Sequence, residues 1–354
     1  MTLIFTVILI ALAFEYVNGF HDTANAIATS ISTKVMTPRQ AITISALGNL
    51  AGALAGTAVA KTIGKGLVDT DFITMQTILC ALAGGIIWNL LTWYIGLPSS
   101  SSHALIGGLC GASLASAGQW SAIHWHGGLL PKVVIPMFVA PMAGLLAGYL
   151  LMGILLAVLS GCNARPWKVN RYFGLGQWAS AIWMSFSHGT NDAQKTMGII
   201  ALTLFAATRA HDFDALPRFL HFLRTPEFEI AAWVKVACAL TMAAGTAAGG
   251  WRIIKTMGHN VVKMQPVHGF AAQSTAAAVI GVATHLGIPL STTHVISGSI
   301  MGVGSTKRLN AVKWGIAGRM LVAWVMTIPI TAGMSYAFVW LLKGLGWAGG
   351  PVAH

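Results

Sequence analysis

Two polar phrases occur twice in this chain, and each copy is set in apolar sequence. Residues 19–26 read Gly-Phe-His-Asp-Thr-Ala-Asn-Ala and residues 189–196 read Gly-Thr-Asn-Asp-Ala-Gln-Lys-Thr, so their glycines and aspartates superpose at a separation of 170 residues. A second pair, at 96–103 and 287–294, carries Gly-x-Pro, hydroxyl residues and a histidine, and superposes at 191 residues. Duplicated polar motifs in an apolar chain are typical of secondary transporters built from two halves.

The charge content restricts the fold class further. Of the 354 residues, 55% are hydrophobic and only 8% are charged. A soluble domain carries about 25% charged residues, so this chain cannot cover a surface that faces water. Because a helix of about 20 apolar residues spans the bilayer, the sequence predicts an all-α polytopic membrane protein with about 10–12 membrane segments. We expect a multi-pass protein of the plasma or inner cell membrane.

The apolar segments differ in length. Long segments that predict spanning helices cover 2–17, 40–60, 72–95, 133–160, 230–250 and 311–342. Shorter pieces that lie near the polar motifs cover 104–117, 177–187, 196–206, 271–286 and 295–304. Short segments at matching places in two halves predict two inverted-topology repeats with broken helices or hairpins that line a site.

The repeats also predict the domain organisation. We expect an N-terminal half at 1–160, a basic connecting loop at 161–176 and a C-terminal half at 177–345. The separation between the copies grows from 170 residues in the first motif to 191 in the second. The polar stretch 207–229 accounts for this growth as an aqueous insertion. The net charge of +12 comes mostly from lysines and arginines in short loops, which favours cytoplasmic loops or contact with lipid headgroups. The bilayer is therefore an expected partner, and nucleic acid is not.

Three of the nine acidic residues lie in or beside the apolar segments that carry the first motif. They are Glu15, Asp22 and Asp192. An acid at membrane depth costs about 2.5 kcal/mol or more, so it indicates a functional site by default. The structural alternative is an acid that pairs with a nearby histidine or lysine. The expected role of the three acids is to bind a cation or a proton.

A second polar residue follows each repeated aspartate by three positions. Asn25 follows Asp22, and Lys195 follows Asp192, which places both members of each pair on one face of a helix. Aspartate with asparagine offers oxygens to a hard cation or a proton. Aspartate with lysine offers an anion site, or an ion pair that replaces one bound cation. The alternative for Lys195 is a side chain that snorkels at a helix end.

The second motif indicates the substrate. Pro98 and Pro289 each precede a run of hydroxyl residues and an apolar helix, which is a helix-start pattern. Free backbone N–H groups and hydroxyls at a helix start bind phosphate or sulfate. A serine run alone is usually a loop, and its repetition is what favours a site. The candidate phosphate ligands are Ser100, Ser101, Ser102, Ser291, Thr292 and Thr293, with Asn25 and Lys195 beside them.

Four histidines accompany these motifs: His21 and His188 flank the aspartates, and His103 and His294 end the hydroxyl runs. A histidine near neutral pH relays protons, and the alternative is an imidazole that orients a neighbouring serine or aspartate.

The charges predict coupling to a cation. Phosphate carries a charge of about −1.5 to −2, and the buried acids add more negative charge. Such a site is unstable in a low-dielectric interior unless the acids are protonated or cations enter with the anion. Uptake against an inside-negative potential of 100 mV costs about 2.3 kcal/mol per charge. The sequence therefore predicts symport, without deciding between protons and sodium.

The four motifs, with Trp88 and Asn89 before the second of them, resemble those of the inorganic phosphate transporter (PiT) family nearly from end to end. The chain is most similar to its bacterial low-affinity carriers. The resemblance implies an inverted-repeat fold, a homodimer, and proton-coupled symport of phosphate, often as a neutral metal–phosphate complex. It implies cation or proton binding at Asp22, Asn25 and Asp192, with Asn191 beside them, and phosphate binding at the hydroxyl runs.

One departure from the family bears on the coupling ion. Sodium-coupled members carry Asp-x-x-Asn in both copies, whereas this chain has Lys195 in the second. The lysine favours protons over sodium and would act as a fixed cation. The alternatives are a sodium-coupled phosphate permease or a sulfate permease of the same fold.

Two other classes compete with transport. An intramembrane metalloenzyme would use His21, Asp22, His188 and Asp192 as ligands, and a receptor or structural subunit would leave the repeated acids unexplained. We expect no enzymatic activity, no catalytic residue, no resident metal and no cofactor besides a co-transported cation.

Overall fold

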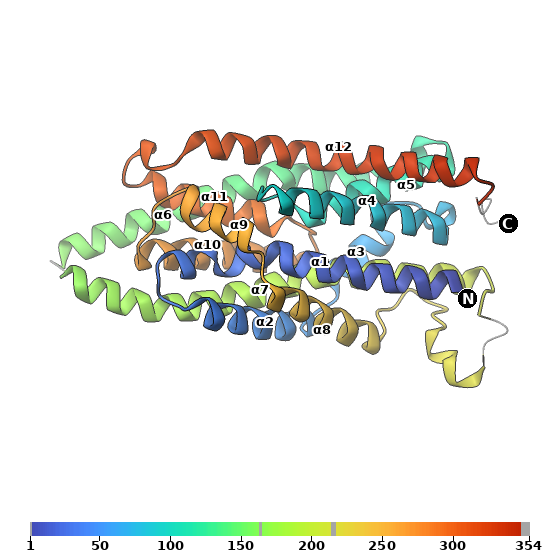
Figure 1. The fold of residues 1–354 in the computed structure, drawn as a ribbon, viewed down its shortest axis with the longest axis horizontal. Helices are drawn as coiled ribbons and strands as arrows, with labels where there is room; N and C mark the ends of the chain where they lie inside the picture. Colours follow the sequence, from blue (N-terminus) through green and yellow to red (C-terminus); the bar gives the residue numbers. More distant parts are fainter. Residues whose placement is uncertain (1, 163–164, 214–216, 348–354) are drawn as a thin grey trace.

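The computed structural model describes residues 2–162, 165–213 and 217–347, and these segments are almost entirely helical (Figure 1). The only β-type pairing in them is one bridge between Val68 and Ile123. The predicted all-α class is confirmed. The helices are α1 (Thr2–Ser32), α2 (Pro38–Leu54), α3 (Ala58–Lys65), α4 (Met75–Tyr94), α5 (Ser101–Ala117), η3 (Trp125–Val134) continued by α6 (Ile135–Gly161), α7 (Pro166–Arg209), α8 (Ala232–Ala248), α9 (Trp251–Lys255) continued by η5 (Thr256–Asn260), α10 (Pro266–His285), α11 (Thr292–Ser305) and α12 (Trp314–Gly344), with short turns η1 (Thr70–Phe72), η2 (Trp120–Ala122), η4 (Arg218–Leu223) and η6 (Leu309–Ala311).

Several of these helices are long and apolar enough to cross a membrane. Within the described residues, four meet this criterion by length and composition: α1, α4, η3 with α6, and α12. Two bent pairs, α2 with α3 at 70° and α8 with the segment Trp251–Asn260 at 61°, raise the number to six. The other helices pack among them. The predicted multi-helix membrane architecture is confirmed, while the four to six helices that meet this criterion are fewer than the 10–12 membrane segments predicted.

The order of the elements repeats. A long helix, a bent pair, a hairpin of two helices and a second long helix make up each half: α1 to α6 in the first, and α7 to α12 in the second. The helices α1 and α7 run in opposite directions along the bundle, and so do α6 and α12 (Figure 1). This arrangement is consistent with the predicted inverted repeats.

The two halves interlock. The helix α5 packs against α12, and α11 packs against α6; likewise α2 packs against α7, and α8 against α1. Each contact within this set joins one half to the other, in addition to the packing of α4 on α5 and of α10 on α7 within the halves, so the interior is shared between the two halves. Close packing needs small residues at these crossings. A Cβ atom at Gly111 would lie 2.1 Å from the Ala332 carbonyl oxygen, and one at Gly302 would lie 2.0 Å from that of Leu145.

The first polar motif does not interrupt its helix, which corrects the predicted boundaries. The sequence predicts a span that ends near residue 17 and a short piece that begins at 196, whereas 19–26 and 189–196 lie inside the continuous helices α1 and α7. The glycines of the motif serve helix crossing. A Cβ atom at Gly19 would lie 2.5 Å from the Met242 carbonyl oxygen, and one at Gly189 would lie 2.3 Å from that of Asn49.

Two predicted loops are shorter than expected. The helix α7 begins at Pro166, so the prediction of a loop over 161–176 is wrong from that residue onward, and 163–164 lie outside the described residues. Proline fits the first turn of a helix because its missing N–H has no partner there anyway. The insertion predicted at 207–229 begins inside the same helix, which continues to Arg209, and contains the turn η4; residues 214–216 lie outside the described part.

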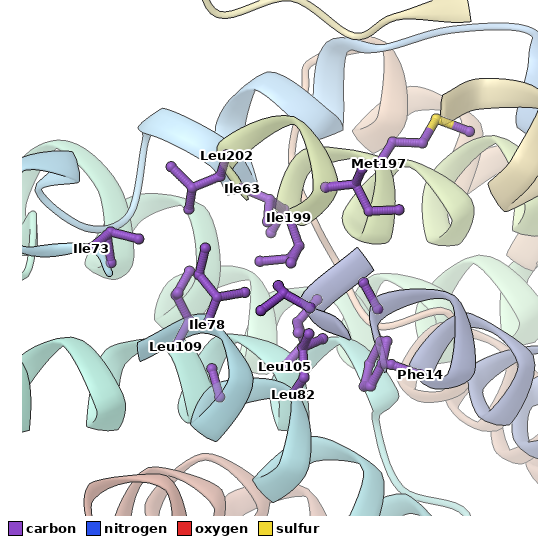
Figure 2. Close-up of a cluster of buried hydrophobic side chains, with 14 of the residues drawn as sticks. Phe14, Ile63, Ile73, Ile78, Leu82, Leu105, Leu109, Met197, Ile199 and Leu202 are labelled. Carbon is purple, nitrogen blue, oxygen red and sulfur yellow. The ribbon is translucent and has the colours of Figure 1, made fainter. Parts of the chain in front are cut away.

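Two apolar clusters hold the helices on either side of a polar layer. One contains Phe14 of α1 and Met197 of α7, together with side chains from α4 and α5 (Figure 2). The other contains Ile27 of α1 and Met184 of α7, with side chains from α6, α10 and α11. Each aspartate of the first motif lies between the two clusters along its own helix, so both are placed in the same interior layer.

Candidate functional site

The hydroxyl runs form the starts of α5 and α11, as the sequence predicts. The hydroxyl oxygens of Ser100 and Ser291 accept hydrogen bonds from the backbone N–H groups of His103 (3.1 Å) and His294 (3.3 Å). This is the N-cap arrangement. The preceding glycine of each hairpin has a positive φ angle, 68° at Gly96 and 67° at Gly287, which lets the chain turn sharply into the hydroxyl run.

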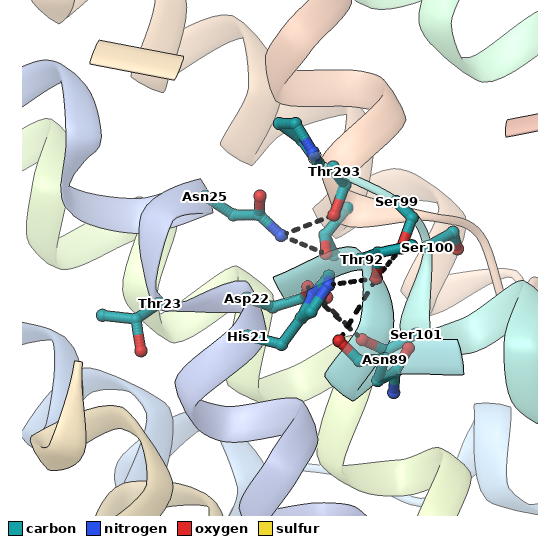
Figure 3. Close-up of polar contacts among 12 residues, drawn as sticks. His21, Asp22, Thr23, Asn25, Asn89, Thr92, Ser99, Ser100, Ser101 and Thr293 are labelled. Carbon is teal, nitrogen blue, oxygen red and sulfur yellow. Dashed lines mark hydrogen bonds and ion pairs between the residues drawn. The ribbon is translucent and has the colours of Figure 1, made fainter. Parts of the chain in front are cut away.

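Side chains of the first motif connect the two runs. The Asn25 amide donates to the hydroxyls of Thr292 (3.2 Å) and Thr293 (2.9 Å), as Figure 3 shows for Thr293. The Lys195 ammonium donates to the hydroxyl of Ser102. Asn25 and Lys195 occupy equivalent positions in the two halves, and so do Thr293 and Ser102. One side chain of each half therefore donates a hydrogen bond to the hydroxyl run of the other half, at equivalent positions.

The two aspartates converge on the same place. The Thr292 hydroxyl donates to Asp192 at 2.8 Å, and the Ser101 hydroxyl donates to Asp22 at 3.4 Å. One carboxylate oxygen of each aspartate and one ring nitrogen of His188 lie within 4.8 Å of one another. All of these side chains are buried. Carboxylate oxygens and an imidazole nitrogen at this spacing are a donor set that suits a cation.

The lysine lies inside this cluster. The Lys195 ammonium donates to the Asp192 carboxylate and, at 2.9 Å, to the Leu290 carbonyl oxygen. Its side chain is 2% exposed, so the alternative of a lysine that snorkels at a helix end is wrong. A buried ammonium needs compensation by carboxylate or carbonyl oxygens, and it has both here.

The four histidines fall into two pairs. His21 lies 2.6 Å from the Asp22 carboxylate, and His188 lies 2.9 Å from that of Asp192. The second ring nitrogen of each contacts a further polar side chain, the Thr92 hydroxyl at 3.0 Å for His21 and the Asn49 amide oxygen at 3.0 Å for His188. These contacts fix the orientation of both rings and of the carboxylates beside them.

The other two histidines stack instead. The rings of His103 and His294 lie edge to face, with centroids 4.8 Å apart. His294 also stacks on Trp324, with centroids 4.2 Å apart. These rings lie behind the hydroxyl runs and link the starts of α5 and α11 to α12.

Two predicted site residues lie apart from the hydroxyl runs. Glu15 is fully buried two helical turns before Asp22, about 10 Å along α1, and accepts a hydrogen bond from the Thr196 hydroxyl. The Asn191 amide donates to the Thr284 hydroxyl at 2.8 Å and contacts the Ile288 carbonyl oxygen at 3.4 Å. It therefore faces the tip of the α10–α11 hairpin.

Sequence analysis assigned no role to two polar residues of α4 in the site. Thr92 accepts from the Ser99 hydroxyl at 2.9 Å and contacts His21. Asn89 lies near Ser101 (Figure 3), and both atoms of its buried amide lack a hydrogen-bond partner among the described residues. The two residues stand three apart in an otherwise apolar helix, and that spacing was the signal that could have identified them.

Comparison with known sequences places this geometry in a family. The sequence profile described as the phosphate transporter family matches residues 18–335. A protein of Mycobacterium bovis named probable low-affinity inorganic phosphate transporter is 46% identical over 338 residues, which are 96% of this chain and 77% of that protein. One of the same name from Bacillus subtilis is 45% identical over 93% of this chain and 95% of its own length.

A solved structure has the same fold. It is described as the sodium-dependent phosphate transporter, is 23% identical in sequence, and superposes with a TM-score of 0.83 over 98% of this chain and 100% of its own. With a family profile that spans both copies of both motifs, and relatives of 45–46% identity that match more than nine-tenths of its length, the chain belongs to the phosphate transporter family.

Proposed function

We propose that this member of the phosphate transporter family is a proton-coupled symporter of inorganic phosphate. In this proposal the hydroxyl runs at the starts of α5 and α11 bind the anion, and the aspartates of α1 and α7 take up the compensating positive charge. The observation that carries the proposal is the convergence of the two hydroxyl runs, connected across the halves by Asn25 and Lys195.

The hydroxyl runs offer what an oxyanion needs. Both lie at helix N-termini, where backbone N–H groups and the positive end of the helix dipole favour negative charge. Ser101, Ser102, Thr292 and Thr293 are buried, so an anion bound to them would be shielded from water. The Lys195 ammonium beside them adds a fixed positive charge.

The charges of the cluster support protons as the coupling ion. The Lys195 ammonium already compensates the Asp192 carboxylate, so the equivalent cation position in the second half is filled by the protein itself. The Asp22 carboxylate faces a histidine and a hydroxyl instead. A phosphate anion beside it requires a proton on the carboxylate or histidine, or a second cation, because uncompensated charges are unstable at this depth.

A neutral metal–phosphate complex is a second form of the substrate. The oxygens of Asp22 and Asp192 with the His188 nitrogen, within 4.8 Å of one another, are the donors that the metal of such a complex would meet. The metal is cargo in this form. The metalloenzyme considered from the sequence is ruled out by the family, which is one of transporters, and His21 is not among the three grouped donors.

The deciding experiment is uptake of labelled phosphate into proteoliposomes. An imposed proton gradient should drive accumulation in the absence of sodium, and a sodium gradient at equal pH should not. Accumulation that follows sodium alone would support the sodium-coupled alternative, for which the 23% identical sodium-dependent structure is the precedent in this fold. If sulfate competes with phosphate for the protein and labelled phosphate is not accumulated, the sulfate permease would be supported. The homodimer implied by the family resemblance stays a prediction, to be tested by mass measurement in detergent.

A further inference from the structure

The tips of the two helical hairpins are equivalent in the repeat but are held by different contacts. The first tip, residues 95–100, joins α4 to α5, and the second tip, residues 286–291, joins α10 to α11. Side chains of α9, η5 and α12 donate to carbonyl groups at the first tip and at the preceding end of α4. These hydrogen bonds run from Arg252 to Tyr94, from Thr256 to Gly96 at 2.8 Å and from Trp324 to Pro98 at 3.1 Å.

The second tip is held mainly by the site. Its carbonyl groups accept hydrogen bonds from Thr62 to Gly287 at 2.8 Å, from Lys195 to Leu290 at 2.9 Å and from Asn191 to Ile288 at 3.4 Å. Two of these three donors flank Asp192. The carbonyl groups of the second tip are therefore held by side chains that adjoin the proposed anion and cation. Those of the first tip are held from α9, η5 and α12, and this tip contacts the site through Ser99 and Thr92, which reaches His21.

Tryptophans pack one side of the first hairpin, whereas none of the described residues that line the equivalent side of the second is a tryptophan. Trp88 donates to the Thr327 hydroxyl at 3.2 Å, and Trp324 donates to the Pro98 carbonyl oxygen while its ring stacks on His294 of the second hairpin. The residue equivalent to Trp88 is Val279, at the separation of 191 residues. The helices α6 and α12 match at a separation of 187 residues, because Gly298 meets Pro141 as Gly107 meets Ile328, so the residue equivalent to Trp324 is Met137. There, between α6 and α10, an apolar groove of about 560 Å³ is lined by Val279 and its neighbours.

The other side of the second hairpin borders a more polar pocket. This pocket has a volume of about 450 Å³; Thr190, Gln194, Thr284 and His285 line it together with the aromatic residues Trp183 and Phe186 and small residues of the α2–α3 bend. The hydrogen bond between Thr284 and Asn191 forms part of its wall, and Asn191 adjoins Asp192. Thr190 and Gln194, which line the pocket, stand two residues before and two residues after Asp192 in α7.

Aromatic rings occupy the equivalent place in the first half. The counterparts of Thr190, Thr284 and His285 are Phe20, Trp93 and Tyr94. The rings of Phe20 and Trp93 pack edge to face at 5.4 Å. The Arg252 guanidinium lies 5.4 Å from the ring centroid of Trp93 and 4.6 Å from that of Tyr94. The space that is open beside the second hairpin is filled by rings and a cation–π contact beside the first.

We propose that the second tip is the moving gate of this transporter and that the polar pocket beside it is the vestibule through which the phosphate ion reaches the hydroxyl runs. The inference rests on the proposed function. Because α1 and α7 run in opposite directions (Figure 1), equivalent positions face opposite ends of the bundle, and the rings of Phe20, Trp93 and Tyr94 fill the place that is equivalent to the vestibule. An anion that draws the Lys195 ammonium away from the Leu290 carbonyl removes one contact that holds the gate.

Cysteine labelling tests the vestibule without phosphate. In a Cys162→Ala background, which removes the one exposed native cysteine, Thr190→Cys is compared with Phe20→Cys at the equivalent position. The other three native cysteines are buried. A membrane-impermeant thiol reagent applied from both faces should label Thr190→Cys at least tenfold faster than Phe20→Cys. Equal rates, or faster labelling of Phe20→Cys, would overturn the assignment of vestibule and closed end.

A clamped hairpin tests the gate. Val279→Trp places in the second hairpin the indole that Trp88 provides in the first. This variant should lower phosphate uptake at least tenfold, while phosphate binding to the purified protein changes less than threefold. Val158→Trp, at a 55% exposed position of α6 outside the groove, is the matched control. Uptake by Val279→Trp at the wild-type rate would refute the gate. If Val279→Trp does not reach the membrane, the labelling of Thr190→Cys and Phe20→Cys still tests which side of the site is open. A wild-type protein that carries no phosphate would refute the proposed function but not the assignment of the vestibule.

Discussion

The two copies of the first motif share a scaffold and differ in charge. In both, an aspartate is followed by a side chain that donates to the hydroxyl run of the opposite half. In α1 this donor is the neutral amide of Asn25, and in α7 it is the ammonium of Lys195. The hydrogen-bond geometry of the repeat is therefore retained while its electrostatics is not. The two aspartates therefore have different electrostatic surroundings, because only Asp192 of the two has a lysine partner within the protein.

Removing the carboxylate without a fixed partner should have the largest effect. Asp22→Asn keeps the shape of the side chain but removes the charge that we propose is compensated during transport. Accumulation of phosphate should fall by about a hundredfold or more, as expected when a buried charge network loses one member. Uptake in proteoliposomes measures this, with the amount of folded protein in the membrane as control. Normal accumulation by Asp22→Asn would exclude that carboxylate from coupling.

Making the two copies alike is the next test. Lys195→Asn gives the second motif the asparagine of the first, and removes a buried ammonium that contacts Asp192, Ser102 and Leu290. Phosphate affinity should fall by about tenfold or more, since hydrogen bonds to charged groups contribute about 1.5–3 kcal/mol. The sodium dependence of uptake should rise at the same time. Unchanged affinity and unchanged ion dependence would show that the charge difference between the copies has no role in coupling.

The hydroxyl acceptors of the two donors provide a finer comparison. Ser102→Ala removes the acceptor of the Lys195 ammonium, and Thr293→Val removes one acceptor of the Asn25 amide. A charged bond is worth about twice a neutral one, so the first change should weaken phosphate binding about tenfold and the second about threefold. Binding isotherms of the purified variants measure both. Equal losses would indicate that both hydroxyls act mainly as ligands of the anion.

The smallest effect on transport concerns the scaffold itself. Gly19→Ala and Gly189→Ala each place a Cβ atom within 2.5 Å of a carbonyl oxygen on a crossing helix. Both should lower the melting temperature by several degrees, in keeping with overpacking costs of about 1–3 kcal/mol. Gly153→Ala is the control, because no atom lies within 4 Å of its added Cβ. A lower melting temperature for only one of the two variants would mean that the halves differ in helix packing as well as in charge.

Much of the site could be predicted because its parts are local. The caps at Ser100 and Ser291 follow from proline and hydroxyl residues at adjacent positions. The partnership of Asp192 with Lys195 follows from helical spacing. The repeat then predicts that both sets converge, although the sequence did not specify that Asn25 crosses to the run of the other half.

The boundaries of the helices were harder to predict for a physical reason. Hydropathy treats 19–26 and 189–196 as interruptions, because polar residues in lipid are costly. In the folded protein other helices cover these segments, so α1 and α7 continue through them and their polar side chains find partners. The first turns of α7 are apolar and basic by composition, and only the capping proline at 166 indicates a helix there. The sequence shows that Phe20 and Thr190 are equivalent, but it does not show which residues surround each of them. The difference between the two hairpin tips could therefore be recognised only from the structure.

The exchange of packing partners between the halves has a consequence for synthesis. The helix α5 is complete long before its main partner α12 has been made, and α6 likewise waits for α11. An unfinished chain in the bilayer must therefore leave the crossing glycines of α5 against lipid until the last helix inserts. Separately expressed halves would have to associate to complete these crossings, and a chain that stops before residue 314 would leave α5 without the helix that it packs against most extensively.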